Sequence, residues 1–464
     1  MATRIAIIGG GPAGHTCATY SARLGAEVTL IERDIIGGAA HLWDCVPSKA
    51  MIGTGGAVSF LNRISGMGLD DVVPKVEHEG LRDRVTYIEN CLGNSVTNLL
   101  ISQQVRLISG EARMIGLNEV EVIFNEQADE NSTKVANKTS EVIKADYVVL
   151  ATGSRPRVPN WAEPDGERVL TTRHAYPPPE IPKHLVVIGS GVTGVEFVHM
   201  FASFGAEVTL IVSRQQVLPN KDPEVAAALE ENFIGRGVKL FMGARANKVE
   251  VIGDCVWVQC DDGRTAVGSH ALLAIGSVPN SDGLGLEEAG IKTENGYVVV
   301  DHNLRSSLPH VYAAGDLSGK LPLSSVASMQ GRKIAEHIMG LHVRPHKHMD
   351  YDKAASAIFT EPEIADVGLV EADAFAEGRK VRVTKVPFSV SAKALINNDT
   401  RGFVKIISDP ATGVILGGSI VGRHAAELIS VLALAVNASL TVVDIANSLL
   451  VHPALSELLA EAAE

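Results

Sequence analysis

The 464-residue chain is longer than one ordinary hydrophobic core supports, so two or three domains are expected. Hydrophobic residues make up 46% of the sequence and charged residues 20%, which is typical of a globular protein. The net charge of −13 argues against a nucleic-acid partner, because a phosphate backbone attracts basic surfaces. Apolar runs are too short for an integral membrane segment, and we expect no secretory signal. Scattered cysteines without a CxxC pair favour a reducing, cytoplasmic location.

From the N-terminus, the chain begins with a pattern that returns later. Residues 4–34 align with residues 184–214, an offset of 180, and the segment Gly-Ala-Glu-Val-Thr-Leu-Ile occurs in both copies. Each copy is predicted to be an apolar strand, a glycine-rich turn, a helix and a second strand. This is the βαβ unit that binds a dinucleotide. One GxGxxG alone is a weak signal, but two copies in this context predict two dinucleotide sites.

The glycines of each copy have separate predicted roles. The first makes the tight turn, the second lets the backbone approach a pyrophosphate, and the third lets the helix pack closely on the strand. In chain order they are Gly9, Gly11 and Gly14 in the first copy, and Gly189, Gly191 and Gly194 in the second. The pyrophosphate would rest on the helix N-terminus, where free N–H groups and the helix dipole favour anions.

The two copies differ at the end of the second strand. Glu32 offers the first copy a carboxylate that accepts hydrogen bonds from a ribose diol. The equivalent position in the second copy is Val212, with Arg214 nearby. This difference favours a 2′-phosphate, hence NADPH, or tolerance of both NADPH and NADH. The alternative is that Arg214 is an ordinary solvated surface residue.

The remaining segments complete an α/β chain with a third, α+β part. Between the copies we expect helices over 50–104, a strand over 105–112, strand pieces and a polar loop (125–139) within 117–145, and a buried strand with a small-residue turn over 147–154. After the second copy we expect a helix over 222–237, strands over 238–262, 272–279 and 311–316, and a helix from about 325. The third part should have strands over 355–369, 380–388 and 402–420 and helices over 423–437 and 441–449.

Several motifs together resemble those of the two-dinucleotide-domain flavoprotein disulfide reductases, such as lipoamide dehydrogenase and glutathione reductase. The resemblance covers essentially the whole chain. Its motifs are the first GxGxxG with Glu32, the Cys-x-Pro-Ser-Lys at 45–49, Ala151-Thr-Gly153, the second GxGxxG followed by Glu196, Gly315-Asp316, and His452-Pro-Ala-Leu-Ser-Glu457.

The resemblance implies FAD on the first copy and NADPH or NADH on the second, in two Rossmann-like domains. Residues 1–155 and 276–342 would form the FAD-binding domain, 156–275 the NAD(P)-binding domain, and 343–464 the domain that makes a homodimer. Asp316 would contact the FAD ribityl–phosphate region, and the helix after Ser324 would point its N-terminus at the flavin. The expected cofactor-binding residues are Gly9, Gly11, Pro12, Ala13, Gly14, Glu32, Lys49, Ala112, Ala151, Thr152, Gly153, Gly189, Gly191, Gly194, Arg214, Gly276, Asp316, Ser324 and Ser325.

The resemblance also implies the catalytic groups. Lys49 would lie beside the flavin and pair with Glu196 from the other domain, which fixes a cation near the atom that accepts hydride. His452 and Glu457 would reach the active site of the partner subunit, where the carboxylate orients the imidazole as an acid–base group. The alternative for His452 is a structural histidine at a subunit interface. Cys45 supplies the one thiol of the redox motif.

The chain departs from the family at the first of two cysteine positions. Ala40 stands there, five residues before Cys45, and alanine cannot form a disulfide. The only substitute would be Cys17, whose pattern indicates a core residue. The sequence is most similar to an actinobacterial branch that keeps one cysteine and resembles NAD(P)H:quinone reductases. Quinones accept electrons directly, and His41 and Trp43 are candidates for lining the acceptor pocket, with ordinary packing as the alternative.

Three functions follow from these observations. The first is transfer of hydride from NAD(P)H to FAD and then directly to a quinone, with protons supplied by His452 and Glu457. The second is a monothiol disulfide reductase at Cys45, or a dihydrolipoamide dehydrogenase-like or transhydrogenase enzyme. The third is a non-catalytic FAD-binding assembly subunit. The intact second glycine motif argues against the third, because an idle subunit does not need it.

Overall fold

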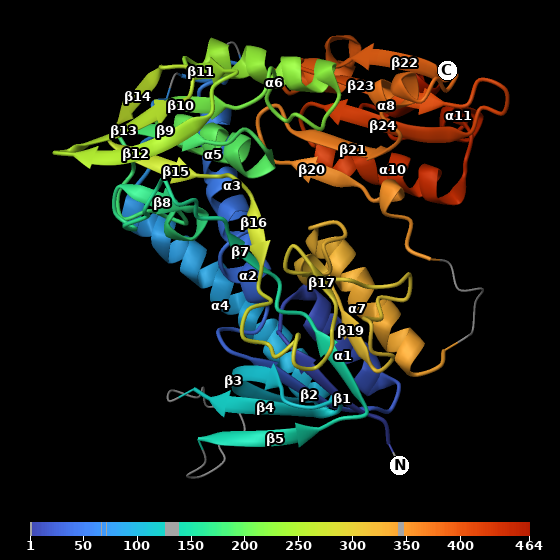
Figure 1. Cartoon of the computed structure of the whole chain (residues 1–464). Coiled ribbons are helices and arrows are strands. Elements are labelled where there is room, and N and C mark those ends of the chain that lie inside the picture. Colours follow the sequence, from blue (N-terminus) through green and yellow to red (C-terminus); the bar gives the residue numbers. More distant parts are fainter. Residues whose placement is uncertain (1, 66, 71, 126–138, 342–347) are drawn as a thin grey trace. The chain divides into compact units, whose positions relative to one another are not determined.

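The computed structural model describes residues 2–65, 67–70, 72–125, 139–341 and 348–464 (Figure 1). The side chains of His41 and Leu42 are not among the described parts. The chain forms two compact units. One comprises Met1–Ser48, Asp83–Pro156 and Ser277–Tyr351, and the other comprises Lys49–Arg82, Arg157–Gly276 and Asp352–Glu464.

A seven-stranded sheet organises the first unit, in the order β19-β6-β1-β2-β3-β4-β5. Its strands are β1 (Arg4–Ile8), β2 (Glu27–Glu32), β3 (Arg106–Met114), β4 (Glu119–Phe124), β5 (Ser140–Lys144), β6 (Tyr147–Leu150) and β19 (Val311–Ala313). The strands from β19 to β3 run parallel, whereas β3, β4 and β5 pair antiparallel. Continuous apolar runs form β1 and β6, because parallel strands are buried on both faces.

Two helices of the first unit pack against each other, α1 (Pro12–Arg23) and α7 (Ser324–Ile338). A methyl group at Gly331 of α7 would lie 2.2 Å from the carbonyl oxygen of Ala13 in α1, so glycine alone permits this approach. The other elements of this unit are α2 (Gly38–Leu42), most of α4 (His78–Ser102), β7 (Ser154–Pro156), β16 (Ser277–Pro279), β17 (Thr293–Glu294), β18 (Tyr297–Val298) and the 3-10 turn η2 (Gly315–Ser318). Helix α3 (Val46–Leu61) begins in this unit, but its residues from Lys49 onward belong to the second unit.

The second unit begins with a five-stranded parallel sheet, in the order β11-β10-β9-β15-β8. Its strands are β8 (Val169–Thr171), β9 (His184–Ile188), β10 (Glu207–Val212), β11 (Lys239–Met242) and β15 (His270–Leu273), and its helices are α5 (Val192–Ser203) and α6 (Pro223–Gly235). An antiparallel sheet follows, with β12 (Ala246–Ile252), β13 (Cys255–Cys260) and β14 (Thr265–Gly268). On β13, Cys255 is exposed and Cys260 is buried, because residues an odd number of positions apart on a strand lie on opposite faces.

The C-terminal part of the second unit is an antiparallel sheet covered by helices. Its strands, in the order β20-β21-β24-β23-β22, are β20 (Ser356–Ile358), β21 (Ile364–Gly368), β24 (Ile415–Val421), β23 (Phe403–Ser408) and β22 (Arg382–Pro387). Its helices are α8 (Glu371–Ala376), α9 (Ala392–Ile396), α10 (Ala425–Ala438), α11 (Val442–Ala446) and α12 (Glu457–Ala463). Ile429 and Leu432 of α10 share one buried apolar core with Val404 and Ile406 of β23.

These sheets confirm the predicted α/β class with a third, α+β part. The expectation of helices over 50–104 is confirmed for α3, which ends at Leu61, and for α4, which begins at His78, but it is wrong for the segment between them. Gly68 in the intervening segment adopts a φ of 80°, and Pro74 lacks a backbone donor, so both oppose a helix. The predicted polar loop over 125–139 lies, apart from its two end residues, outside the described residues.

The divisions of the chain can be compared with the predicted domains. The compact units divide after Pro156 and after Gly276, next to the boundaries expected between the two dinucleotide-binding parts. Residues 49–82, however, group with 157–276 and with the C-terminal part. The predicted boundary at 342/343 lies outside the described residues.

A buried lysine connects the C-terminal sheet with helix α6. The Nζ atom of Lys405 on β23 lies 3.0 Å from Asp222 and 2.8 Å from Glu371, and it also pairs with Glu224. Lys405 is 1% exposed and Asp222, which caps α6, is 3% exposed. Burial disfavours the charged ammonium, but the three carboxylates outweigh that effect and raise the pKa of Lys405.

Replacing this lysine should destabilise the fold strongly. Lys405→Met leaves Asp222 buried without a cation, so we expect the free energy of unfolding to fall by about 3–5 kcal/mol. Urea unfolding followed by circular dichroism measures this loss. The matched control is Lys380→Met at an exposed lysine, which should change stability by less than about 0.5 kcal/mol. Equal losses in both variants would contradict the assignment.

A buried histidine lies on α5. His199 is 1% exposed, and its Nδ1 atom accepts a hydrogen bond from Arg236 at 2.9 Å, so the ring is neutral with its proton on Nε2. Burial, followed by the positive charge of Arg236, lowers the pKa of His199 to about 3. Because an unfolded histidine titrates near 6.5, the unfolded chain binds the proton first as pH falls.

Stability should therefore fall as pH decreases below about 6.5 toward 3. His199 alone contributes a slope that approaches about 1.4 kcal/mol per pH unit in this window. His199→Gln keeps an acceptor for Arg236 and removes the titration. Unfolding free energies measured between pH 7 and pH 5 should show a shallower slope in this variant, and an unchanged slope would refute the neutral, buried state.

Candidate functional site

The first glycine-rich turn connects β1 to α1. Gly9 adopts a φ of 105°, and its N–H donates to Ile31 at 2.8 Å. A Cβ at Gly9 would lie 2.3 Å from the carbonyl oxygen of Ala151, and a Cβ at Gly14 would lie 1.8 Å from the carbonyl oxygen of Gly9. At Gly11 the same atom would meet nothing within 4 Å. The backbone of the protein itself therefore requires glycine at positions 9 and 14, whereas Gly11 faces open space, where a pyrophosphate fits.

Glu32 ends β2 beside this turn. Its carboxylate accepts hydrogen bonds from the N–H groups of Gly10 at 2.6 Å and Asp34 at 2.9 Å. Burial raises the pKa of Glu32, and these two hydrogen bonds oppose that rise. Each oxygen keeps a lone pair, so the carboxylate is oriented and still able to accept from a ribose hydroxyl.

The second turn repeats this geometry between β9 and α5. A Cβ at Gly189 would lie 2.3 Å from the carbonyl oxygen of Ala274, and one at Gly194 would lie 1.8 Å from that of Gly189, whereas Gly191 faces open space. The position that corresponds to Glu32 is Val212, which is fully buried.

Arg214 is exposed two residues beyond the end of β10. Its carbonyl oxygen accepts a hydrogen bond from the N–H of Gly243 at 3.0 Å, so the backbone of this residue is fixed. The side chain is free to meet solvent or a bound nucleotide. The preference for NADPH over NADH stays a prediction.

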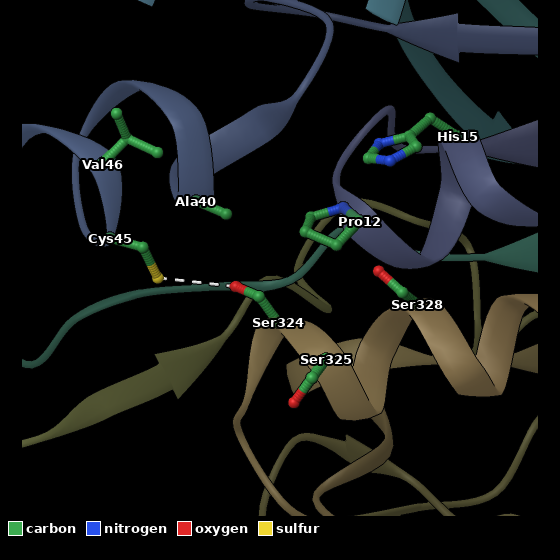
Figure 2. Close-up of a pocket in the computed structure, with 8 residues that line it drawn as sticks. All are labelled: Pro12, His15, Ala40, Cys45, Val46, Ser324, Ser325 and Ser328. Atoms are coloured by element: carbon green, nitrogen blue, oxygen red, sulfur yellow. Dashed lines mark hydrogen bonds between the residues drawn. The ribbon is translucent and has the colours of Figure 1, made fainter. Parts of the chain in front are cut away.

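A cavity of about 270 Å³ opens in the first unit (Figure 2). It is lined by Pro12, His15, Ala40, Cys45, Val46, Ser324, Ser325 and Ser328. The first turns of α1, α3 and α7 all contribute to this lining, and helix N-termini favour negative charge. Four predicted site residues, Pro12, Cys45, Ser324 and Ser325, are thus brought together.

Sequence reasoning missed two polar residues of this lining. His15 lies one turn after Pro12 on α1, and Ser328 lies one turn after Ser324 on α7. The helical spacing of three or four residues from predicted positions was the signal that could have found them. Trp43 does not belong to this lining, and the side chain of His41 lies outside the described residues.

The thiol of Cys45 faces the cavity. Its Sγ atom lies 3.4 Å from the hydroxyl of Ser324, and Ala40 is next to it (Figure 2). All five cysteines are free. Cys17 is fully buried in α1, where burial raises the pKa of its thiol to about 12, so it behaves as the predicted core residue.

The Ala151-Thr-Gly153 turn is held by residues that the sequence did not single out. The hydroxyl of Thr152 donates to the carbonyl oxygen of Asn280 at 2.7 Å, and the Asn280 amide donates back to Thr152 at 2.9 Å. Asp316 in η2 accepts from the Ser154 hydroxyl at 2.5 Å. These hydrogen bonds hold Thr152 and the Asp316 carboxylate, both predicted cofactor residues, in fixed positions.

Two other predicted cofactor residues lie elsewhere. Ala112 is in β3 opposite Val122 and packs against an apolar core rather than lining the cavity. Gly276 has a φ of 93°, and its carbonyl oxygen accepts from the N–H of Arg157 at 2.9 Å. Their roles toward a cofactor stay predictions.

Lys49 and Glu196 form the expected ion pair. Lys49 Nζ lies 2.8 Å from Glu196 Oε2, and the other carboxylate oxygen accepts from the N–H of Phe359 at 3.0 Å. Glu196 is 6% exposed. Both partners belong to the second compact unit, because residues 49–82 group with it. We expected Lys49 and Glu196 to come from different domains, whereas both lie in the same compact unit. Lys49 follows Cys45 by four residues at the start of α3, one turn further along.

His452 and Glu457 also pair. His452 Nδ1 lies 2.7 Å from Glu457 Oε1, and Glu457 Oε2 accepts from the N–H of Ala454 at 2.9 Å. The Ala454 N–H and His452 lower the pKa of Glu457. The His452 side chain is 73% exposed, and the His452–Pro453 peptide bond is cis. The imidazole is thus oriented through Nδ1, which leaves Nε2 outside this pair.

The residues present fit two dinucleotides, since each turn has one glycine open to a phosphate and two that the backbone requires. The described residues contain no cluster of three or more His, Cys, Asp or Glu suited to a metal ion. None of the described helices combines the length and apolar character needed to cross a bilayer.

Comparison with known proteins agrees with this geometry. The pyridine nucleotide-disulphide oxidoreductase pattern matches residues 3–331, and the dimerisation domain of the same family matches residues 354–463. An NAD(P)H dehydrogenase (quinone) of Mycobacterium tuberculosis is 42% identical, with 100% of this chain and 94% of the relative covered. A dihydrolipoyl dehydrogenase of Bacillus subtilis is 34% identical, over 99% and 95% of the two chains.

Solved structures give the same result. The crystal structure of LpdA from Mycobacterium tuberculosis matches with a TM-score of 0.91 and 40% identity, covering 99% of each chain. The flavoprotein disulfide reductase RclA of Escherichia coli matches with a TM-score of 0.85 and 25% identity, again over 99% of each chain. The chain therefore belongs to the pyridine nucleotide-disulphide oxidoreductase family and is a flavoprotein oxidoreductase that uses FAD and NAD(P)H.

Proposed function

We propose that this flavoenzyme is a homodimeric, cytoplasmic NAD(P)H:quinone oxidoreductase that works without a redox disulfide. The single observation that supports this most is that Ala40 and Cys45 line one cavity, in a chain whose other family motifs are intact. An acceptor that needs a dithiol finds no second sulfur there. The similarity to a mycobacterial protein named NAD(P)H dehydrogenase (quinone) adds independent support.

The chain's own residues bind and orient the reactants. Gly11 and Glu32 would hold the FAD pyrophosphate and ribose, and Gly191 would leave room for the pyrophosphate of the nicotinamide nucleotide. FAD, when bound, supplies the two-electron chemistry that links NAD(P)H oxidation to reduction of an acceptor. Lys49, fixed by Glu196, would place a positive charge beside the isoalloxazine and stabilise negative charge there.

His452 and Glu457 would supply protons to the reduced acceptor. The ionised Glu457 holds the imidazole through Nδ1, which leaves Nε2 to carry a proton outward. Exposed apolar side chains precede this pair, since Leu449 is fully exposed and Val451 is 74% exposed. Exposed apolar side chains of this kind are typical of a surface that another protein covers. The matched dimerisation domain supports a second copy of this chain as that protein.

Disulfide reduction is the second candidate. The free Cys45 thiol in the cavity and the 34% identity to a dihydrolipoyl dehydrogenase favour it. A non-catalytic subunit is the third, and the complete geometry of the second glycine turn argues against it. These functions differ in the electron acceptor they use, so activity measured with different acceptors distinguishes them.

An acceptor screen should distinguish the three functions. Purified holoenzyme should oxidise NADPH or NADH with a soluble quinone, and should not turn over lipoamide or glutathione disulfide. Nucleotide absorbance at 340 nm measures both. Robust disulfide turnover would favour the second candidate, and no acceptor-dependent oxidation at all would favour the third.

Cys45→Ser provides the matched thiol test. Serine keeps a polar group of similar size beside Ser324, so FAD content should be unchanged. Quinone turnover should stay near the wild-type rate if electrons pass directly from the flavin. Loss of quinone turnover with FAD retained would show that the thiol takes part and that direct transfer is wrong.

Alanine substitutions at two glycines of the second turn should have different effects, one on nucleotide binding and the other on stability. Gly191→Ala should fold normally, because its Cβ meets nothing, but it should raise the KM for NAD(P)H about 10-fold or more by occupying the space for phosphate. Gly194→Ala should instead reduce thermal stability, since its Cβ would lie 1.8 Å from a carbonyl oxygen. Steady-state kinetics and melting temperatures separate the two effects. A normal KM in Gly191→Ala would place the nucleotide elsewhere.

A further inference from the structure

The segment that follows β20 contacts the Lys49–Glu196 pair. We propose that Phe359, supplied by the part of the chain that matches a dimerisation domain, is a positioning residue for Lys49 and Glu196 in flavin reduction. The inference rests on the proposed function only in placing Lys49 beside the flavin. It gives the C-terminal domain a role in the active site of its own chain, in addition to dimerisation.

The backbone of Phe359 completes the binding of the buried carboxylate. Glu196 receives Lys49 on one oxygen at 2.8 Å and the Phe359 N–H on the other at 3.0 Å. A carboxylate that is only 6% exposed must have its oxygens satisfied, because burying an unpaired charge is costly. The orientation of Glu196 is thus fixed from two different segments of the chain.

The ring of Phe359 contacts the cation. Lys49 Nζ lies 4.8 Å from the centroid of this ring, within the range of a cation–π interaction. A lysine side chain has four rotatable bonds, so one carboxylate alone leaves its ammonium free to move around that partner. The ring supplies a second contact and restricts the ammonium to one position.

A charge cluster anchors the segment two residues further on. Glu361 pairs with Arg63 and with Arg401, the latter at 2.5 Å, and Arg401 also contacts Asp399 at 2.8 Å. Burial opposes ionisation of Glu361, but hydrogen bonds from Ser59 and Arg401 hold its pKa below the usual range. This cluster fixes the course of the segment.

Helix α3 meets this segment at both ends. Lys49, in its first turn, contacts Phe359, and Arg63, just beyond its last residue, contacts Glu361. Two anchored contacts along one helix prevent the segment from sliding past it. The position of the Lys49 ammonium is therefore set by the C-terminal domain as well as by Glu196.

Phe359→Leu tests the proposal, because leucine keeps the N–H that binds Glu196 and removes only the ring. In stopped-flow measurements on the holoenzyme, we expect the rate constant for flavin reduction by NAD(P)H to fall about 3- to 10-fold. The KM for NAD(P)H and the FAD content should be unchanged. Phe359→Tyr, which keeps the ring face, should restore the rate.

A double-mutant cycle separates positioning from a general structural effect. In a Lys49→Met background, Phe359→Leu should cause no further loss of rate, since the ring then has no ammonium to position. The matched control is Phe403→Leu, whose ring lies 4.3 Å from Lys385 in the same domain but contacts neither Lys49 nor Glu196. This variant should reduce flavin at the wild-type rate.

Three outcomes would overturn the proposal. They are an unchanged rate in Phe359→Leu, an equal loss in the Lys49→Met background, or an equal loss in Phe403→Leu. If Phe359→Leu does not fold, Phe359→Met serves in its place, because it has a similar volume and no ring. The measured step is flavin reduction by NAD(P)H, which involves no acceptor. If the quinone assignment failed, this result would therefore still stand, and the two failures can be told apart.

Discussion

The structure depends on one backbone contact that occurs twice. In each glycine-rich turn, the Cα of the last glycine approaches the carbonyl oxygen of the first so closely that a methyl group would lie 1.8 Å from it. This contact brings helices α1 and α5 down onto their strands and directs their N-termini at the space beside the middle glycine. The 180-residue repeat in the sequence thus places the same close contact, and the same open middle glycine, in both βαβ units.

Local patterns predicted most of the fold. Apolar runs and glycine turns placed β1, α1 and β2 because their determinants lie within 30 residues of one another. The break after α3 was missed, since an apolar, glycine-containing segment reads much like a helix until Gly68 and Pro74 are weighed.

The candidate site was predicted only where a motif carries it. Lys49, Glu196, His452 and Glu457 were predicted from family motifs, and the structure contains both ion pairs, with Lys49 and Glu196 in one compact unit rather than in two. Phe359 and Asn280 were not found, because their roles arise from contacts with residues more than 100 positions away. No local pattern records such contacts. The backbone N–H that Phe359 donates to Glu196 is also present in every residue except proline, so the residue type at this position does not reveal it.

The Lys405 cluster has a consequence for the loop that follows β10. Lys221 at the far end of this loop binds Asp366 at 2.6 Å, and the adjacent Asp222 is held by Lys405. Earlier in the loop, Leu218 donates to the carbonyl oxygen of Ser190 in the glycine turn. The exposed stretch around Arg214 therefore lies between backbone positions that are fixed by these contacts. Side chains in this stretch can therefore be exchanged without loss of the contacts that hold the loop at Leu218, Lys221 and Asp222.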